Sequence, residues 1–212
     1  ARIASKVCMG LSAERLTPGE RALAEDIVRL LARDAVVQVR VALAEAVRSN
    51  PALPHDVAVQ LARDVDEVAL PILHFSECLT DDDLIEIVRA GDPVRQRAVA
   101  NRKTVSSGVS GSLIDCGDET VLIELLNNRS ATIDEAGYGR ALNRFGERTR
   151  VPDTMARRQA LPSEIVVRLI NMVSEELQAQ RVSRYHLTPS IAKEVAVKTR
   201  ERGACGLYSS GS

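Results

Sequence analysis

The chain has very few aromatic residues. Only 2% of its 212 residues are aromatic, and tryptophan is absent. The interior must therefore be built from leucine, valine, isoleucine and alanine, which suits closely packed helices. Proteins that hold single-stranded nucleic acid stack its bases on aromatic side chains, so this composition argues against that class.

Net charge, cysteine motifs and long apolar runs are also lacking. The formal net charge is −1, so no global field attracts DNA, RNA or an anionic membrane. The four cysteines are scattered without a C-x-x-C motif, which fits a reducing compartment, and we predict a cytoplasmic location. Neither a signal peptide nor an apolar run of bilayer length is apparent, so we expect no membrane partner.

No catalytic signature is present in the sequence. The glycine motifs of phosphate loops, dinucleotide folds and serine hydrolases are missing. His55-Asp56 lacks the further His and Asp ligands that a metal-dependent hydrolase needs. The run Asp81-Asp82-Asp83 fits the first turn of a helix, where acids complement the helix dipole. We therefore predict no catalytic, metal or cofactor site, and a protein that is not an enzyme.

What the chain does contain is a recurring phrase that opens with an aliphatic residue followed by Thr, Pro, Ser or Asp. The six copies are Leu53-Pro54-His55, Leu79-Thr80-Asp81, Val105-Ser106-Ser107, Ile133-Asp134-Glu135, Leu161-Pro162-Ser163 and Leu187-Thr188-Pro189. The intervals between their first residues are 26, 26, 28, 28 and 26 residues. Leu16-Thr17-Pro18 reads as a seventh copy, 37 residues before Leu53. A fixed period in this range is the mark of a stacked repeat architecture.

Each repeat reads as a hairpin of two short helices. The phrase itself is a helix-start signal, because Thr, Ser and Asp accept hydrogen bonds from first-turn amides and Pro is tolerated there. A second start follows at Asp66, Asp92 and Asp118, and Gly91 and Gly117 precede the last two as helix stops. Helices of roughly ten residues are unstable alone, so each hairpin must pack on its neighbours. We predict an all-α fold: a right-handed α-solenoid of stacked, HEAT-like hairpins.

The predicted organisation is a single repeat domain over residues 1–202. It comprises an N-terminal capping hairpin at 15–50, central repeats at 51–160 and C-terminal capping helices at 161–202, before a flexible tail at 203–212. Residues 106–112 are rich in Ser and Gly and read in isolation as a linker. The repeat register favours a weak helix there, because Val105, Val109 and Leu113 keep the apolar positions. The linker remains the alternative.

With the repeats aligned, four segments resemble a known family. They are VRVALAEAV at 39–47, LPHDVAVQLARD at 53–64, AVANRKTVSSGVSGSLIDCGDETVLIELLNN at 98–128, and LPSEIVVRLINMVSEEL at 161–177. The resemblance is to the bacterial family called domain of unknown function 2336, found mainly in alphaproteobacteria, and more widely to HEAT-like and leucine-rich-variant helical repeats. It covers roughly residues 15–200. The family implies a bacterial cytoplasmic protein with no assigned reaction, and so no functional residues to carry over.

Charge is unevenly distributed along the repeats. Residues 51–92 hold ten acids against two arginines, whereas residues 140–158 hold six arginines against two acids. We expect one helix of each hairpin to line an inner face, so that exposed arginines of the second helices form a strip. The candidate partner-binding residues are Arg95, Arg102, Arg129, Arg140 and Arg144. Such a strip suits an acidic or phosphorylated protein segment, and we predict a protein-binding scaffold, with bacterial signalling as its setting by family association.

Two further interpretations stay open. Some HEAT-like proteins bind or repair DNA in a basic groove, although the neutral charge and the scarcity of aromatic residues argue against a nucleic-acid partner here. Alternatively the chain assembles with itself. The apolar stripe of residues 163–181 could form a homodimer face, or the acidic stretch 51–92 could pair with the basic stretch 93–158 of a neighbour.

Overall fold

The computed structural model describes residues 17–147 and 150–172. Several predictions lie outside these residues. They concern the copy of the repeat phrase at Leu187, most of the proposed C-terminal capping helices, and the tail at 203–212.

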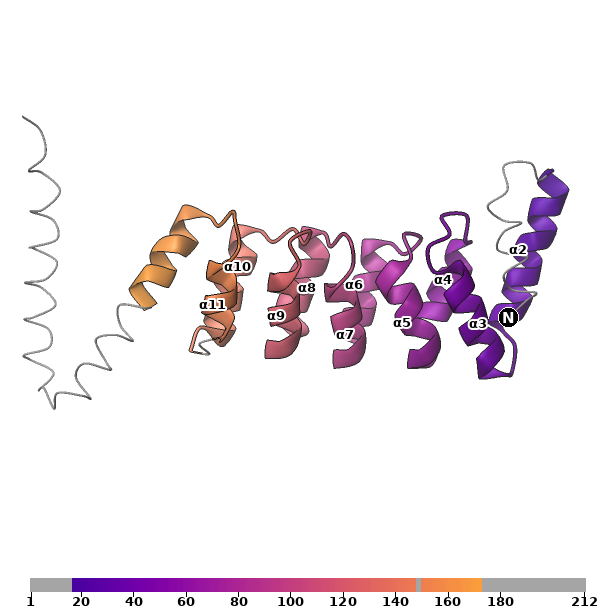
Figure 1. Ribbon diagram of the computed structural model, residues 1–212, viewed down its shortest axis with the longest axis horizontal. Helices are drawn as coiled ribbons and strands as arrows, with labels where there is room; N and C mark the ends of the chain where they lie inside the picture. Colours follow the sequence, from indigo (N-terminus) through magenta and orange to yellow (C-terminus); the bar gives the residue numbers. More distant parts are fainter. Residues whose placement is uncertain (1–16, 148–149, 173–212) are drawn as a thin grey trace, which may run out of the picture. The chain divides into compact units, whose positions relative to one another are not determined.

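Every regular element in the described residues is a helix, so the predicted all-α class is confirmed (Figure 1). The helices are α2 (Pro18–Ala32), α3 (Val37–Val47), α4 (His55–Ala62), α5 (Asp66–Phe75), α6 (Asp81–Arg89), α7 (Pro93–Ala100), α8 (Ser107–Cys116), α9 (Glu119–Asn127), α10 (Glu135–Phe145) and α11 (Arg150–Ala156). The only β-type pairing among these residues is an isolated bridge between Val105 and Ala131.

The chain divides into two compact units, Ala1–Gln159 and Ala160–Ser212. The division falls where the sequence predicts the central repeats to end. In the second unit the described residues 163–172 are helical, with Ile165 and Leu169 buried and Val166, Val167 and Ile170 exposed. That pattern agrees with an amphipathic helix starting at Ser163, and its predicted continuation to Arg181 lies outside the described residues.

The first helix of each hairpin begins where the repeat phrase predicts. Thr80 forms a capping box with Asp83: the Thr80 hydroxyl accepts from the Asp83 amide at 3.3 Å, and the Thr80 amide donates to the Asp83 carboxylate at 2.8 Å. Ser106 and Asp134 cap α8 and α10 through their side chains in the same place. These caps satisfy first-turn amides that have no partner within the helix.

The second helices begin in two different ways. Asp92 and Asp118 are side-chain N-caps of α7 and α9, as predicted. Asp66 differs, because it is the first residue of α5 and the cap position belongs to Val65. Gly91 lies between α6 and α7 with φ of 83°, a left-handed conformation that favours glycine, so its prediction as a helix stop is confirmed.

Residues 107–116 form the helix α8, so the linker alternative for this segment is wrong. Its two glycines leave room for side chains of neighbouring first helices. A Cβ atom at Gly111 would lie 3.1 Å from Nη2 of Arg140, and one at Gly108 would lie 3.8 Å from Cδ1 of Ile85. The low helix propensity of this segment is offset by register, because Val109 and Leu113 are completely buried.

Within the first unit, each helix packs on its hairpin partner, and most helices also pack on the helix two places along the chain. The second helices α3, α5, α7, α9 and α11 contact one another in that order, and α6, α8 and α10 do the same among the first helices. Figure 1 shows the hairpins following one another, with the turn inside each hairpin at one edge and the connection to the next hairpin at the opposite edge. Aliphatic side chains such as Leu61, Leu73, Leu113 and Leu125 fill the space between them and have no exposed surface.

Candidate functional site

Arg102, one of the five predicted partner-binding residues, is buried rather than exposed. Only 7% of its surface is accessible. Its guanidinium donates to the carbonyl of Leu73 and, at 2.6 Å, to the carbonyl of Ser76, both in the preceding hairpin. Burial lowers the pKa of Arg102 from its ordinary value, partly offset by attraction to Asp81 and Glu77. The prediction of an exposed side chain is therefore wrong at this position, and its role is structural.

Three other predicted arginines also reach the preceding hairpin. Arg95 donates through Nε to Asp66 at 3.0 Å and through Nη2 to the carbonyl of Asp64 at 2.6 Å. The Nε of Arg140 donates to Asp115 at 2.9 Å, and Arg144 donates to the carbonyl of Ile114. Arg129 is the exception, because it is exposed in the loop after α9.

The five arginines do not form a row on the second helices. Only Arg95 lies within such a helix, α7. Arg140 and Arg144 belong to α10, which is the first helix of its hairpin, whereas Arg102 and Arg129 follow the ends of α7 and α9. The predicted continuous strip is therefore wrong in its placement. The sequence register was correct for the apolar positions. The five arginines follow one another at intervals of 7, 27, 11 and 4 residues, so they were assigned to one face without such a register.

The connections between hairpins carry a set of links that sequence reasoning missed. The side-chain amide of Asn128 donates to the carbonyls of Ala100 and Arg102, each at 2.8 Å. Arg158 does the same one hairpin later, donating to the carbonyl of Ala131 at 2.8 Å and to three carbonyls at or after the end of α9: Leu125, Leu126 and Asn128. Because the last carbonyls of a helix have no partner within it, each hairpin caps the second helix of the hairpin before it.

Cys78 occupies the corresponding place in an earlier hairpin. Its thiol donates to the carbonyls of Asn50, at 3.5 Å, and Pro51, at 3.7 Å. Cysteine, arginine, asparagine and arginine therefore perform one task at Cys78, Arg102, Asn128 and Arg158. These links have only one sequence signal. It is a polar or sulfur-containing side chain that lies about one repeat after the end of the second helix of the preceding hairpin.

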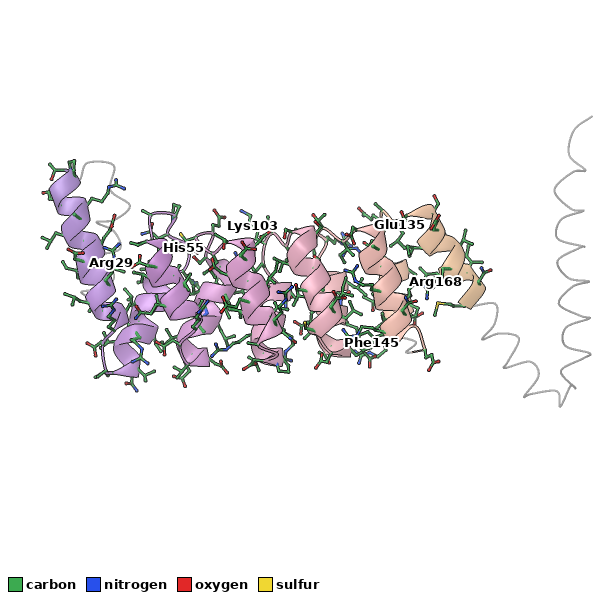
Figure 2. The ribbon with its side chains drawn as sticks, turned by 180° about the vertical axis from the view of Figure 1, so that it is seen from behind. Arg29, His55, Lys103, Glu135, Phe145 and Arg168 are labelled. Atoms are coloured by element: carbon green, nitrogen blue, oxygen red, sulfur yellow. The ribbon has the colours of Figure 1, made fainter. Side chains whose placement is uncertain are left out.

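The first helices of successive hairpins are also joined to one another by ion pairs and hydrogen bonds. Arg29 pairs with Asp56 at 2.9 Å, and His55 pairs with Asp83 at 2.8 Å. Figure 2 shows His55 at the edge of the connecting loops, the same edge as Lys103 and Glu135, with Phe145 at the opposite edge. His55 therefore contacts the first helix of the next hairpin, α6, through Asp83.

These contacts lower the pKa of several carboxyls. The hydrogen bond from Arg40 lowers the pKa of Asp64, and that from Arg29 lowers the pKa of Asp56, in both cases against the opposing effect of partial burial. Burial raises the pKa of Asp83, but hydrogen bonds from Thr80 and His55 outweigh it, so the pKa lies below its ordinary value. Three acids of the stretch 51–92, namely Asp56, Asp64 and Asp83, are thus bound to neighbouring hairpins.

The described residues contain no group of three or more His, Cys, Asp or Glu side chains arranged to hold a metal ion. Cys78 and Cys116 are both free thiols. In the same part of the chain, no helix has the length and apolar character required to cross a membrane.

This succession of hairpins matches one known protein family. A family model described as an uncharacterised protein conserved in bacteria, domain of unknown function 2336, matches residues 68–210. The chain belongs to this family. The match begins within α5 and includes every described helix after it. Neither the curated proteins nor the solved structures contain a significant match.

Proposed function

We propose that this member of the family is a non-enzymatic helical-repeat scaffold that binds a protein partner. The observation that carries the proposal is the direction of the polar contacts. Arg95, Arg102, Asn128 and Arg158 all reach back to the preceding hairpin, so the repeats are held in register by side chains as well as by their core. A framework of this kind presents equivalent surface positions at regular intervals, which is the property that repeat proteins use for binding.

We further propose that the fold is a right-handed, HEAT-like α-solenoid. Supporting this, the second helices contact one another in chain order, as do α6, α8 and α10. In a solenoid each repeat touches only its neighbours, and the dominant helix contacts in the first unit have that pattern. The polar links with sequence separations close to one repeat support the same arrangement.

A bacterial cytoplasmic setting, with a role in signalling or regulation, completes the proposal. The family is conserved in bacteria. The free thiols of Cys78 and Cys116 suit a reducing compartment.

The test is affinity capture from a lysate of the source bacterium, followed by titration of the purified partner. The folded chain should retain a discrete protein that binds it saturably in calorimetry. The Leu73→Asp variant is the control, because a charge at this fully buried position prevents the core from forming. Proteins retained equally by both forms recognise unfolded chain. If the folded form retains nothing beyond the control, or retains only nucleic acid, the scaffold proposal is wrong.

Self-assembly is a second candidate, favoured by one observation. Val166 and Val167 are 39% and 57% exposed on neighbouring positions of the helix in the second unit. Exposed apolar side chains grouped on one helix are suited to a dimer face. Sedimentation equilibrium of the wild type and of Val166→Ser/Val167→Ser tests it. A dimer lost in the variant supports self-assembly through this helix, and a wild-type mass that stays monomeric at all concentrations refutes it.

A further inference from the structure

Three valines are exposed at the turns of three successive hairpins. Val36 is 51% exposed, Val65 is 47% exposed and Val94 is 38% exposed. They lie 29 residues apart along the chain, at the starts of α3, α5 and α7. Because α3 packs on α5 and α5 on α7, the starts of these helices follow one another along the edge that carries the turns inside the hairpins (Figure 1), and each start carries one of the valines. We call Val36, Val65 and Val94 the valine edge.

The backbone at each of these valines is held by the same kind of hydrogen bond. Its backbone amide donates to an aspartate carboxylate within the preceding two residues: Val36 to Asp34 at 2.8 Å, Val65 to Asp64 at 2.7 Å and Val94 to Asp92 at 2.8 Å. These bonds hold the backbone of each turn, so part of the cost of ordering the surface has already been met in the free protein. Exposed apolar side chains at equivalent sites on ordered turns indicate a binding surface rather than scattered surface residues.

Charges at the valine edge differ between its ends and its middle. Arg33 is exposed near Val36, and Arg89 is exposed at the end of α6, on the turn before α7. Near Val65, Arg63 is paired with Glu86 at 2.6 Å, and Glu67 is exposed in the first turn of α5. The ends therefore offer exposed guanidinium groups, which favour carboxylates, whereas the guanidinium group in the middle is already paired with Glu86.

The spacing between the valines of the valine edge indicates the secondary structure of the partner. Packed helices lie about 8–10 Å apart, so successive valines are separated by roughly that distance. An α-helix returns to the same face after seven residues, a rise of about 10.5 Å. A β-strand places residues of one face about 6.6 or 13 Å apart and does not match. Polyproline segments advance about 9.3 Å per turn, but they dock in aromatic grooves, and the residues of this edge are aliphatic or charged.

We propose that the valine edge binds an amphipathic helix of a protein partner, with apolar residues at every seventh position and carboxylates toward both ends. This inference rests on the proposed scaffold function and adds its surface and the chemistry of its partner. Three apolar residues at such spacing occupy fifteen residues, or about 21 Å of helix. The partner is neutral or basic between its two acidic ends, because Glu67 is exposed in the first turn of α5, two residues after Val65.

The experiment that tests this is site-specific photo-crosslinking in a lysate of the source bacterium. A benzophenone amino acid replaces Val65 in one form of the full chain and Leu23 in a control form, and mass spectrometry identifies the crosslinked peptides. Leu23 is 62% exposed in the first half of α2, so it matches Val65 in being an accessible apolar residue and lies away from the turn between α2 and α3. We expect the Val65 form alone to capture a peptide whose sequence has the apolar and acidic pattern stated above.

Binding of the captured partner is then measured with two serine variants. Val36→Ser/Val65→Ser/Val94→Ser should weaken binding by at least about thirtyfold, since it removes the apolar contact at all three turns. Its fold is protected, because serine is a preferred residue at the N-cap positions of α3 and α5. Leu23→Ser is the control variant and should leave binding unchanged.

The outcomes separate this inference from the function on which it rests. A partner that binds the triple-serine variant as tightly as the wild type, or a crosslinked segment without the apolar spacing or acidic ends, overturns the valine edge and leaves the scaffold standing. Equal capture by the Val65 and Leu23 forms also overturns it. If the wild-type chain captures no specific protein, both the valine edge and the scaffold function are wrong.

Discussion

Replacing Arg102 by methionine removes one of the links between hairpins while keeping most of the side-chain volume. The guanidinium donates to the carbonyls of Leu73 and Ser76, and Arg102 is 7% exposed. Loss of the donors leaves two carbonyls without these partners, at a cost of about 1–3 kcal/mol each. Removing the charge returns part of this, because a buried guanidinium is expensive to desolvate and its Nε has no hydrogen-bond partner. We expect a net loss of about 2 kcal/mol in the free energy of unfolding.

Urea denaturation followed by far-ultraviolet circular dichroism measures this loss. Arg129→Met is the control, because Arg129 is exposed in the loop one hairpin later, and its effect should stay within about 0.5 kcal/mol. Arg102→Lys tests geometry, since a single ammonium cannot reproduce the fork of the guanidinium, and should recover only part of the stability. If Arg102→Met unfolds at the same urea concentration as Arg129→Met, the reasoning about the link is refuted.

The remaining predictions concern glycine substitutions in helix α8 and the dependence of stability on pH. Gly108→Ala should raise the free energy of unfolding by up to about 1 kcal/mol through helix propensity, whereas Gly111→Ala should gain less, because its methyl group would lie 3.1 Å from Nη2 of Arg140; equal gains in thermal melts contradict the contact. The pKa of Asp64 is lowered in the folded chain, so its stabilising contribution is full above about pH 4 and is lost as the pH falls below that value. Unfolding free energies measured between pH 7 and pH 3 should therefore fall less steeply for Asp64→Asn than for the wild type, and equal slopes would show that the Arg40–Asp64 pair is not the cause.

Much of the fold was accessible from the sequence because one physical signal repeats. The starts at Thr80, Ser106 and Asp134 each combine an aliphatic residue with a side-chain cap, and the structure places a helix after each. The same register overruled the local composition of residues 106–112, where Ser and Gly favour a loop. Buried apolar positions such as Val109 and Leu113 decided the outcome, because burial contributes more than propensity.

The candidate site was harder to predict from the sequence, because charged residues do not recur at a fixed interval in this chain. An arginine can lie on a surface or in a link between helices, and only the distance to its acceptor distinguishes the two. Arg102 and Arg144 bind backbone carbonyls, which carry no sequence signal at all. Val65 was overlooked for the opposite reason, since an isolated valine beside Asp64 resembles a core residue until its exposure is measured.

The most direct test of the account compares two kinds of variant against the same purified partner by calorimetry. One variant is Val36→Ser/Val65→Ser/Val94→Ser on the exposed edge, and the other is Arg95→Met/Arg144→Met in the links between hairpins. The account predicts that the valine variant melts like the wild type but loses binding, whereas the arginine variant melts at a lower temperature and keeps its affinity while folded. The reverse result, in which the arginine variant stays stable and loses the partner while the valine variant still binds it, would contradict the account.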